Sequence, residues 1–279
     1  MIRKIEKKLI AIDLDGTTLN DESKIAPETS QVIQKLLNKG HIVSIATGRS
    51  YRKSYHLYNE LRLNTPIVNY NGAWAHHPGN LNWKQGYHMT LDLDLAFSLL
   101  HLKQEPEINL IAAETAEKVF VDRTRKEYQS EYIPFQLMGE KLFPFTEEYL
   151  TENPTSVSVF TPIEENIPTI QDKIIKRYGN KIEVQTWGGR TPTLEIVSLG
   201  IQKAMGVERI ADYYNIQRKN ILAFGDEAND YEMIQYAGHG VVMKNGIDKL
   251  KHVSDDLLII QMMKMVSHNI YLNILNFKL

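Results

Sequence analysis

Two aspartates, Asp13 and Asp15, follow directly on an apolar run near the start of the chain. The run, residues 9–12, is typical of a strand that is buried on both faces of a parallel sheet. Both carboxylates would then lie past the carboxyl end of that strand, where open α/β sheets bind their ligands. Carboxylates are costly to bury unless a cation or a reaction uses them. We therefore interpret the pair as a candidate catalytic and metal site, with a solvated Asp-x-Asp turn as the alternative.

Three further polar segments come at the ends of expected strands or the starts of expected helices. They are Thr47-Gly48-Arg49, Lys203, and Gly225-Asp226-Glu227-Ala228-Asn229-Asp230. Because the carboxyl ends of parallel strands lie along one sheet edge, these segments can converge on the two aspartates. Acids alone would repel a phosphate dianion, whereas acids that hold Mg²⁺, with a lysine and hydroxyl or backbone donors, would stabilise it. The set therefore indicates phosphoryl transfer.

The order of expected elements predicts two domains. The first and last parts of the chain alternate strands with helices, which implies parallel strands with right-handed crossovers. The middle shows two-sided alternation with interleaved helical stretches, which indicates a separate α+β domain. We expect a Rossmann-like parallel-sheet core from residues 1–84 and 189–279, with an inserted α/β cap domain at 85–188. The expected strands are 9–12, 41–46, 66–69, 156–160, 181–185, 193–197, 220–224 and 239–242, and the expected helices are 27–38, 50–61, 91–103, 167–178, 203–214 and 231–237.

Composition narrows the class of protein. The 279 residues allow more than one domain, and a net charge of −2 with interspersed signs gives no indication of a nucleic-acid binder. The absence of cysteine excludes disulfides, thiolate metal sites and cysteine nucleophiles. The charged N-terminus does not resemble a signal peptide, and the apolar stretch 257–266 is too short to span a membrane. We expect a cytoplasmic protein that binds a small phosphorylated metabolite, without nucleic-acid or membrane partners.

The motifs together resemble those of the haloacid dehalogenase superfamily of phosphatases, in its Cof-type branch with a C2-type α/β cap. The resemblance covers nearly the whole chain up to about Asp256. It rests on Asp13-Leu14-Asp15-Gly16-Thr17-Thr18-Leu19, Thr47-Gly48-Arg49, Asn69-Tyr70-Asn71-Gly72-Ala73 and Gly225-Asp226-Glu227-Ala228-Asn229-Asp230, in this order. One departure is Ala204, which follows Lys203 where the family usually has a glycine.

The resemblance implies a role for each matched position. Asp13 would be the nucleophile that forms an aspartyl-phosphate, and Asp15 would protonate the leaving oxygen and then activate water. Mg²⁺ would bind Asp13, the backbone carbonyl of Asp15, and Asp226. Asp230 would orient the ion or its waters, and Lys203 would offset charge between the phosphate and the nucleophile. The phosphate and substrate would be bound by Gly16, Thr47, Gly48, Arg49, Asn71, Gly72 and Asn229.

Several of these assignments have plain structural alternatives. Thr47 could simply cap the helix expected at 50–61, because threonine is a good N-cap. Arg49 could form a surface salt bridge, and Asn71 with Gly72 could simply make a turn. Lys203 could be a solvated helix lysine.

After Asp256 the resemblance stops, and an apolar stretch stands where the family would have a polar loop. Restoring one guanine after the Asp256 codon and reading the new frame, with permitted codon choices, gives an acidic, glycine-containing segment of the family's type. We therefore hypothesise that a one-base deletion rewrote the C-terminus. A divergent amphipathic tail helix is the alternative.

The function that follows is a Mg²⁺-dependent phosphatase. It would hydrolyse small phosphomonoesters, such as sugar phosphates or phosphorylated cofactors, through an aspartyl-phosphate. One alternative is a phosphomutase of the same superfamily. Another is a non-catalytic ligand-binding protein disabled by its altered tail, although Asp13 and Asp15 are intact and a binder needs neither.

Overall fold

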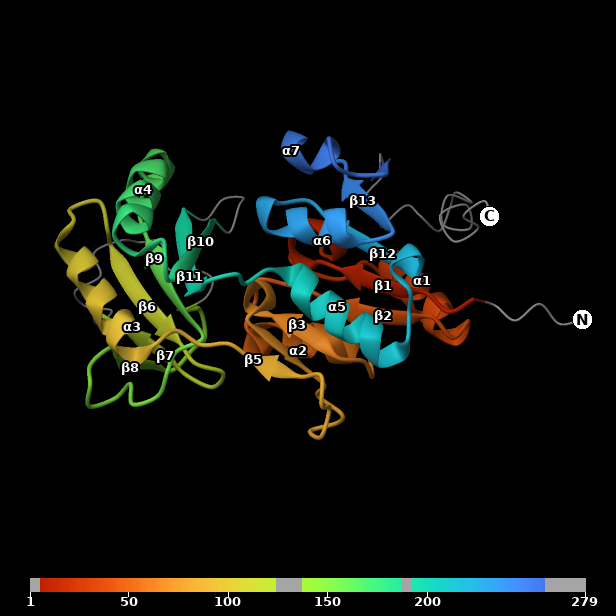
Figure 1. Ribbon diagram of the computed structural model, residues 1–279, viewed down its shortest axis with the longest axis horizontal. Coiled ribbons are helices and arrows are strands. Elements are labelled where there is room, and N and C mark those ends of the chain that lie inside the picture. The colour runs from red at the N-terminus through yellow and green to blue at the C-terminus, as the bar shows by residue number, and fades with distance from the viewer. Residues whose placement is uncertain (1–5, 124–136, 187–191, 259–279) are drawn as a thin grey trace, which may run out of the picture.

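The computed structural model describes residues 6–123, 137–186 and 192–258, and these form two lobes (Figure 1). One lobe, the core domain, contains a five-stranded parallel sheet, and the other, the cap domain, contains a six-stranded sheet. Two connections join the lobes, one between β5 and α3 and one between β11 and α5. The expected α/β architecture of a parallel core with an inserted cap is confirmed. The hypothesis of a one-base deletion, and its alternative of a tail helix, concern a stretch that lies outside the described residues beyond residue 258.

The core sheet has the order β14-β13-β12-β1-β2, with every pair of neighbours parallel. Strand β1 (Leu9–Ile12) is fully apolar because helices cover both of its faces. Ile10 and Ile12 pack with α1 and α2, whereas Leu9 and Ala11 pack with α5 and α6. The remaining elements are β2 (Ile42–Ile45), β12 (Ile221–Gly225), β13 (His239–Met243), β14 (Asp256–Leu258), α1 (Pro27–Asn38), α2 (Tyr51–Glu60), α5 (Lys203–Tyr214), α6 (Tyr231–Tyr236) and α7 (Asp248–Lys251).

The third expected parallel strand largely leaves the core sheet. Strand β3 (Ile67–Asn69) touches β2 through a single parallel bridge between Ala46 and Val68. It then pairs antiparallel with β4 (Trp74–His76), which pairs with β5 (Tyr87–His88). Local hydrophobicity predicts the strand but not its partner, because pairing is decided by the hairpin that follows.

The cap sheet has the order β10-β11-β9-β6-β7-β8 and is antiparallel except for the pair β7–β8. Apolar residues of the two cap helices pack with alternate residues of this sheet and form the cap's hydrophobic core. The strands are β6 (Leu110–Glu114), β7 (Val119–Val121), β8 (Leu142–Pro144), β9 (Ser156–Phe160), β10 (Ile182–Thr186) and β11 (Thr193–Ser198), and the helices are α3 (Leu93–Leu99) and α4 (Ile167–Tyr178).

Strand β11 differs from its expected place. The sequence order assigns residues 193–197 to the core, yet β11 pairs with β10 and β9 in the cap sheet. The alternating pattern marks a strand without naming its neighbours, so the return to the core cannot be located from it. We propose that the cap begins after β5 and ends after β11. Its C-terminal limit then lies about ten residues beyond the expected limit at residue 188.

No helix among the described residues is long and apolar enough to cross a membrane. Strand β14 contains Leu257 and Leu258, the first residues after Asp256, and pairs with β13 at the edge of the core sheet.

Candidate active site

Asp13 lies immediately after β1, at the carboxyl edge of the core sheet, and is 5 % exposed. Its backbone N–H donates to the carbonyl of Phe224 on β12, which fixes its place beside the neighbouring strand. Lys203, the first residue of α5, donates from Nζ to Asp13 Oδ1 at 2.7 Å and to Asp230 Oδ1 at 2.7 Å. A buried ammonium at a helix N-terminus is unfavourable alone, so the two carboxylates are what stabilise it there.

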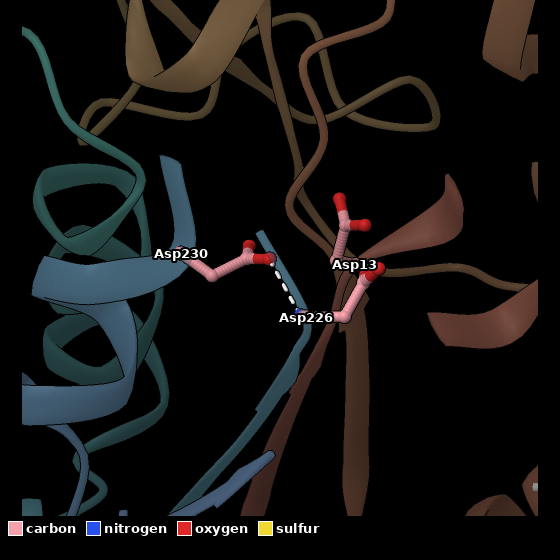
Figure 2. Close-up of side chains that lie close together, drawn as sticks. All are labelled: Asp13, Asp226 and Asp230. Carbon is pink, nitrogen blue, oxygen red and sulfur yellow. Dashed lines mark hydrogen bonds between the residues drawn. The ribbon is translucent and has the colours of Figure 1, made fainter. Parts of the chain in front are cut away.

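Three carboxylates meet at this edge, from Asp13, Asp226 and Asp230 (Figure 2). One oxygen of each lies within 4.8 Å of the others, and all three residues are buried. Asp226 follows β12, and Asp230 ends the short helical turn that comes next. Asp230 Oδ2 accepts hydrogen bonds from the N–H groups of Asp226 at 2.9 Å and Glu227 at 3.1 Å, so its orientation is fixed by the turn itself.

The electrostatics of the cluster favour a cation. Burial raises the pKa of Asp13 well above its ordinary value, against the opposing effect of Lys203. Burial and the neighbouring Asp230 raise the pKa of Asp226 to about 7. Three close carboxylates with one lysine carry excess negative charge, which a divalent cation would offset. Hard oxygen ligands of this kind are those that Mg²⁺ prefers, so the donor set fits this ion.

Gly16 allows the loop after Asp13 to approach the cluster. Its φ is +73°, and a Cβ there would lie 2.0 Å from Asp226 Oδ2. A side chain at this position would therefore displace the Asp226 carboxylate as well as strain the backbone.

Asp15 stands apart from the three carboxylates. It lies in the tight turn η1 (Leu14–Thr18), and its side chain is 57 % exposed. Arg49 donates to both of its oxygens, from Nε to Oδ2 at 2.7 Å and from Nη2 to Oδ1 at 2.5 Å. The arginine side chain is itself only 4 % exposed, so the surface salt bridge considered for Arg49 is replaced by a buried guanidinium that holds an exposed carboxylate.

The remaining predicted phosphate ligands gather on the side of β2 and β3. Asn71 has a φ of +54°, a conformation that asparagine tolerates, and its amide lies against Gly48, where an added Cβ would be 3.0 Å from Oδ1. Asn71 Oδ1 accepts from Asn229 Nδ2 at 2.9 Å. Asn71 Nδ2 donates to Glu195 Oε2 at 2.6 Å. The structure thus brings the second, third and fourth motifs together.

The structure can be compared with the structural alternatives considered for Lys203, Thr47 and Gly72. Lys203 is fully buried between carboxylates and is not a solvated lysine. Thr47 Oγ1 accepts from the N–H of Arg49 at 3.1 Å, ahead of Ser50, the N-cap of α2, so Thr47 does not cap that helix and its phosphate contact stays a prediction. Gly72 packs against the backbone ahead of Lys203, because a Cβ there would lie 2.2 Å from the Gln202 carbonyl.

Sequence reasoning missed several residues that complete the site. Thr17 Oγ1 donates to Asp226 Oδ1 at 2.8 Å, and Asn245 Nδ2 donates to Asp226 Oδ2 at 2.8 Å. Asn245 follows β13, so the rule that singled out the other motifs, a polar side chain after a parallel strand, could have found it. Glu195, by contrast, lies inside a strand of the cap, and no local signal separates it from a solvated residue.

Comparison with known proteins agrees with this arrangement. A family model described as haloacid dehalogenase-like hydrolase matches residues 10–262. The chain belongs to the haloacid dehalogenase-like hydrolases. The recognition from the motifs is confirmed, and so is the expectation of an enzyme.

Relatives of this haloacid dehalogenase-like hydrolase include named phosphatases. The 5-amino-6-(5-phospho-D-ribitylamino)uracil phosphatase YitU of Bacillus subtilis is 38 % identical over 250 residues, which cover 88 % of this chain and 90 % of the relative. The HMP-PP phosphatase of Serratia proteamaculans is 25 % identical over 260 residues, covering 91 % and 89 %. A haloacid dehalogenase-like hydrolase structure from B. subtilis superimposes with a TM-score of 0.76 at 22 % identity, covering 94 % of this chain and 99 % of the other.

Proposed function

We propose that this haloacid dehalogenase-like hydrolase is a Mg²⁺-dependent phosphatase that hydrolyses small phosphomonoesters through an aspartyl-phosphate. The observation that carries the proposal is the contact between Asp13 and Lys203 inside a cluster of three buried carboxylates. The names of the relatives support a phosphatase, and the substrate named for the Bacillus relative contains a ribityl phosphate. We expect the substrate to be a phosphorylated small molecule. We also expect the protein to act in the cytoplasm and to have no nucleic-acid or membrane partner.

The first half of the proposed reaction uses Asp13 as nucleophile. Its carboxylate oxygen forms a bond to phosphorus while the bond from phosphorus to the leaving oxygen breaks, and Asp15 gives its proton to that oxygen. Lys203 opposes the effect of burial on the pKa of Asp13, which favours the ionised nucleophile, and it offsets the charge of the phosphoryl group. Bound Mg²⁺, held by Asp13, the Asp15 carbonyl and Asp226, would neutralise the phosphoryl oxygens.

In the second half, water attacks the aspartyl-phosphate. Asp15 accepts the proton of that water, the bond from phosphorus to the Asp13 oxygen breaks, and inorganic phosphate leaves with the enzyme regenerated. In the conformation described, Arg49 pairs with both oxygens of the Asp15 carboxylate at the rim of the site. Each proposed proton transfer therefore uses one Asp15 oxygen that leaves this pairing, while Arg49 holds the other in place.

The test is turnover of p-nitrophenyl phosphate with and without Mg²⁺. We expect Asp13→Asn to lower kcat at least about 10³-fold, because it removes the nucleophile. Asp21→Asn, a matched change at an exposed aspartate, should leave kcat unchanged. Activity that survives in Asp13→Asn, or that does not depend on a divalent ion, would contradict the mechanism.

The two alternatives give other outcomes in the same assay. Release of free phosphate without a bisphosphate activator argues against a phosphomutase. A complete lack of turnover with a panel of metabolite phosphates would favour the ligand-binding protein.

A further inference from the structure

Both carboxylate oxygens of Asp226 accept a hydrogen bond from a side chain on another segment of the core. Thr17 Oγ1 donates to Oδ1 at 2.8 Å, and Asn245 Nδ2 donates to Oδ2 at 2.8 Å. The last torsion of an aspartate side chain is soft, so a single donor would leave the carboxylate plane free to turn. Two donors, one on each oxygen, fix the plane of this carboxylate.

The amide of Asn245 has a second partner in the loop after β1. Its Nδ2 also donates to the backbone carbonyl of Gly16 at 3.1 Å. A carbonyl and an ionised carboxylate only accept, so the amide must present its nitrogen to both, with one N–H bond available for each. Asn245 therefore connects Asp226 to the tight turn η1, and Thr17, which lies in that same turn, makes a parallel connection.

The backbone around Asn245 is also fixed to Asp226. The loop that carries Asn245 follows β13, the strand next to β12 in the core sheet. Within this loop, Gly246 N–H donates to the carbonyl of Met243 at 2.8 Å, and Ile247 N–H donates to the backbone carbonyl of Asp226 at 3.0 Å. The exposed Asn245 side chain thus comes from a loop that is tied to the same aspartate that the side chain contacts.

The two segments that Asn245 connects are those that would supply ligands to a divalent cation. In the proposed function, Mg²⁺ is held by Asp13, the backbone carbonyl of Asp15, and Asp226. Asp15 comes directly before Gly16 in the tight turn. An amide that bonds to both Gly16 and Asp226 therefore limits how far the turn can move from the carboxylate.

We propose that Asn245 is a positioning residue that adapts the acidic cluster to Mg²⁺ rather than to a larger divalent cation. The inference rests on the proposed function, because it requires the same metal site. Mg²⁺ binds oxygen at about 2.0–2.1 Å in nearly ideal octahedral geometry, whereas Ca²⁺ accepts about 2.3–2.6 Å and flexible geometry. Ligands that are no longer held in place can still satisfy Ca²⁺ but not the strict geometry of Mg²⁺. Loss of the Asn245 amide therefore weakens Mg²⁺ binding more than Ca²⁺ binding.

The experiment is calorimetric titration of Mg²⁺ and of Ca²⁺ into protein that has been freed of metal by a chelator. We expect Asn245→Ala to weaken Mg²⁺ binding about 10- to 100-fold, the usual effect of removing a group that orients a metal ligand. Its Ca²⁺ affinity should fall less than about threefold, so that the ratio of the two affinities changes. Asp226→Asn should abolish the binding of both ions, which shows that the measured heat comes from this cluster.

Asn220→Ala is the matched control. Asn220 Nδ2 donates to the carboxylate of Glu6 at 2.6 Å, which is an amide–carboxylate contact of the same kind. Asn220 directly precedes β12, whereas Asp226 directly follows it, so the control lies at the opposite end of the same strand. Asn220→Ala should leave the affinities for both ions unchanged.

Two substitutions of Thr17 separate hydrogen bonding from packing. Thr17→Ser keeps the hydroxyl that donates to Asp226 and should retain Mg²⁺ affinity within about threefold. Thr17→Val keeps the shape without the hydroxyl and should lose at least about tenfold. Equal Mg²⁺ affinities in the two variants would overturn the view that hydrogen bonds position the Asp226 carboxylate.

The remaining outcomes separate this inference from the proposed function. Unchanged Mg²⁺ affinity in Asn245→Ala, or a lower melting temperature of this variant without metal, overturns the positioning role and leaves the phosphatase intact. An equal loss of affinity for Mg²⁺ and Ca²⁺ overturns the preference for the smaller ion. Wild-type protein that binds Mg²⁺ but does not turn over p-nitrophenyl phosphate overturns the phosphatase alone. Wild-type protein that binds neither ion, or Asp226→Asn that binds them as the wild type does, overturns both.

Discussion

The guanidinium of Arg49, which is almost completely buried, donates hydrogen bonds to both carboxylate oxygens of Asp15. The residues are 34 positions apart, and the planar guanidinium fixes the carboxylate in two directions at once. For an exposed acid this contact contributes little to stability. The contact instead fixes the orientation of the Asp15 carboxylate, because an exposed aspartate without it would occupy several rotamers.

Replacing Arg49 by lysine should therefore reduce catalysis rather than stability. Lysine keeps the charge but cannot form the paired hydrogen bonds. We expect kcat for p-nitrophenyl phosphate to fall about tenfold, within the range of general acid–base effects, with KM changed less than about twofold. Arg62→Lys, at an exposed arginine, is the control. An unchanged kcat in Arg49→Lys would show that Asp15 needs no such support.

Gly16→Ala tests the geometry of the metal cluster. The new Cβ would collide with the Asp226 carboxylate, so we expect Mg²⁺ affinity and activity to fall by at least about tenfold. Gly40→Ala is the matched control, because Gly40 has a φ of +83° with nothing within 4 Å of its Cβ position. Both variants bear similar backbone strain, and only Gly16→Ala should lose metal binding by calorimetry. Equal metal affinity in the two would refute the clash.

Arg52 and Glu114 test the contact between the core and the cap. Arg52 also donates to the carbonyls of Thr115 and Ala116, at 2.9 and 2.7 Å. Burial raises the pKa of Glu114, and Arg52 partly offsets this effect. Arg52→Met should lower the free energy of unfolding by about 3 kcal/mol, because it leaves a carboxylate that is 4 % exposed without its partner.

The double variant Arg52→Met with Glu114→Gln should recover part of that loss, since the buried charge is gone. Urea denaturation of the wild type, the two single variants and the double variant gives the four free energies of unfolding that this double-mutant cycle needs. A double variant whose loss of stability equals the sum of the two single losses would mean that the pair is not coupled.

His76 should make the protein sensitive to acid. Burial, with smaller effects of His88 and His77, lowers its pKa to about 3. The unfolded chain binds this proton near pH 6.5 and the folded chain does not, so stability is complete above pH 6.5 and falls toward pH 3. The contribution is roughly 1.4 kcal/mol per pH unit in that window.

His76→Phe isolates this effect, because it keeps a ring against Trp74, whose centroid lies 4.0 Å from that of His76, and removes the titrating group. Other titrating side chains are common to both proteins. Thermal unfolding from pH 3.5 to 7.5 should show a steeper acid loss for the wild type than for the variant. Parallel curves would contradict a partly buried His76 that stays neutral in the folded protein.

Elements with a strong local pattern were predicted well. The helices expected at 27–38, 167–178 and 203–214 coincide with α1, α4 and α5, since apolar periodicity and a local start signal mark a helix within its own sequence. Strands β6 and β7 were not predicted individually, and β11 was assigned to the wrong sheet, because a strand's identity depends on partners far along the chain.

The sequence by itself determined that three carboxylates would gather, because Asp13 and Asp226 follow strands whose carboxyl ends a parallel sheet brings to one edge, and Asp230 lies in the turn after Asp226. Tertiary structure alone decided how these groups are supported. Lys203 and Asp13 are 190 residues apart, and Glu195 and Asn71 are 124 apart. Local sequence selects residue types and strand ends, whereas the Lys203–Asp13 contact arises only when the core domain folds, and the Glu195–Asn71 contact only when the two domains pack.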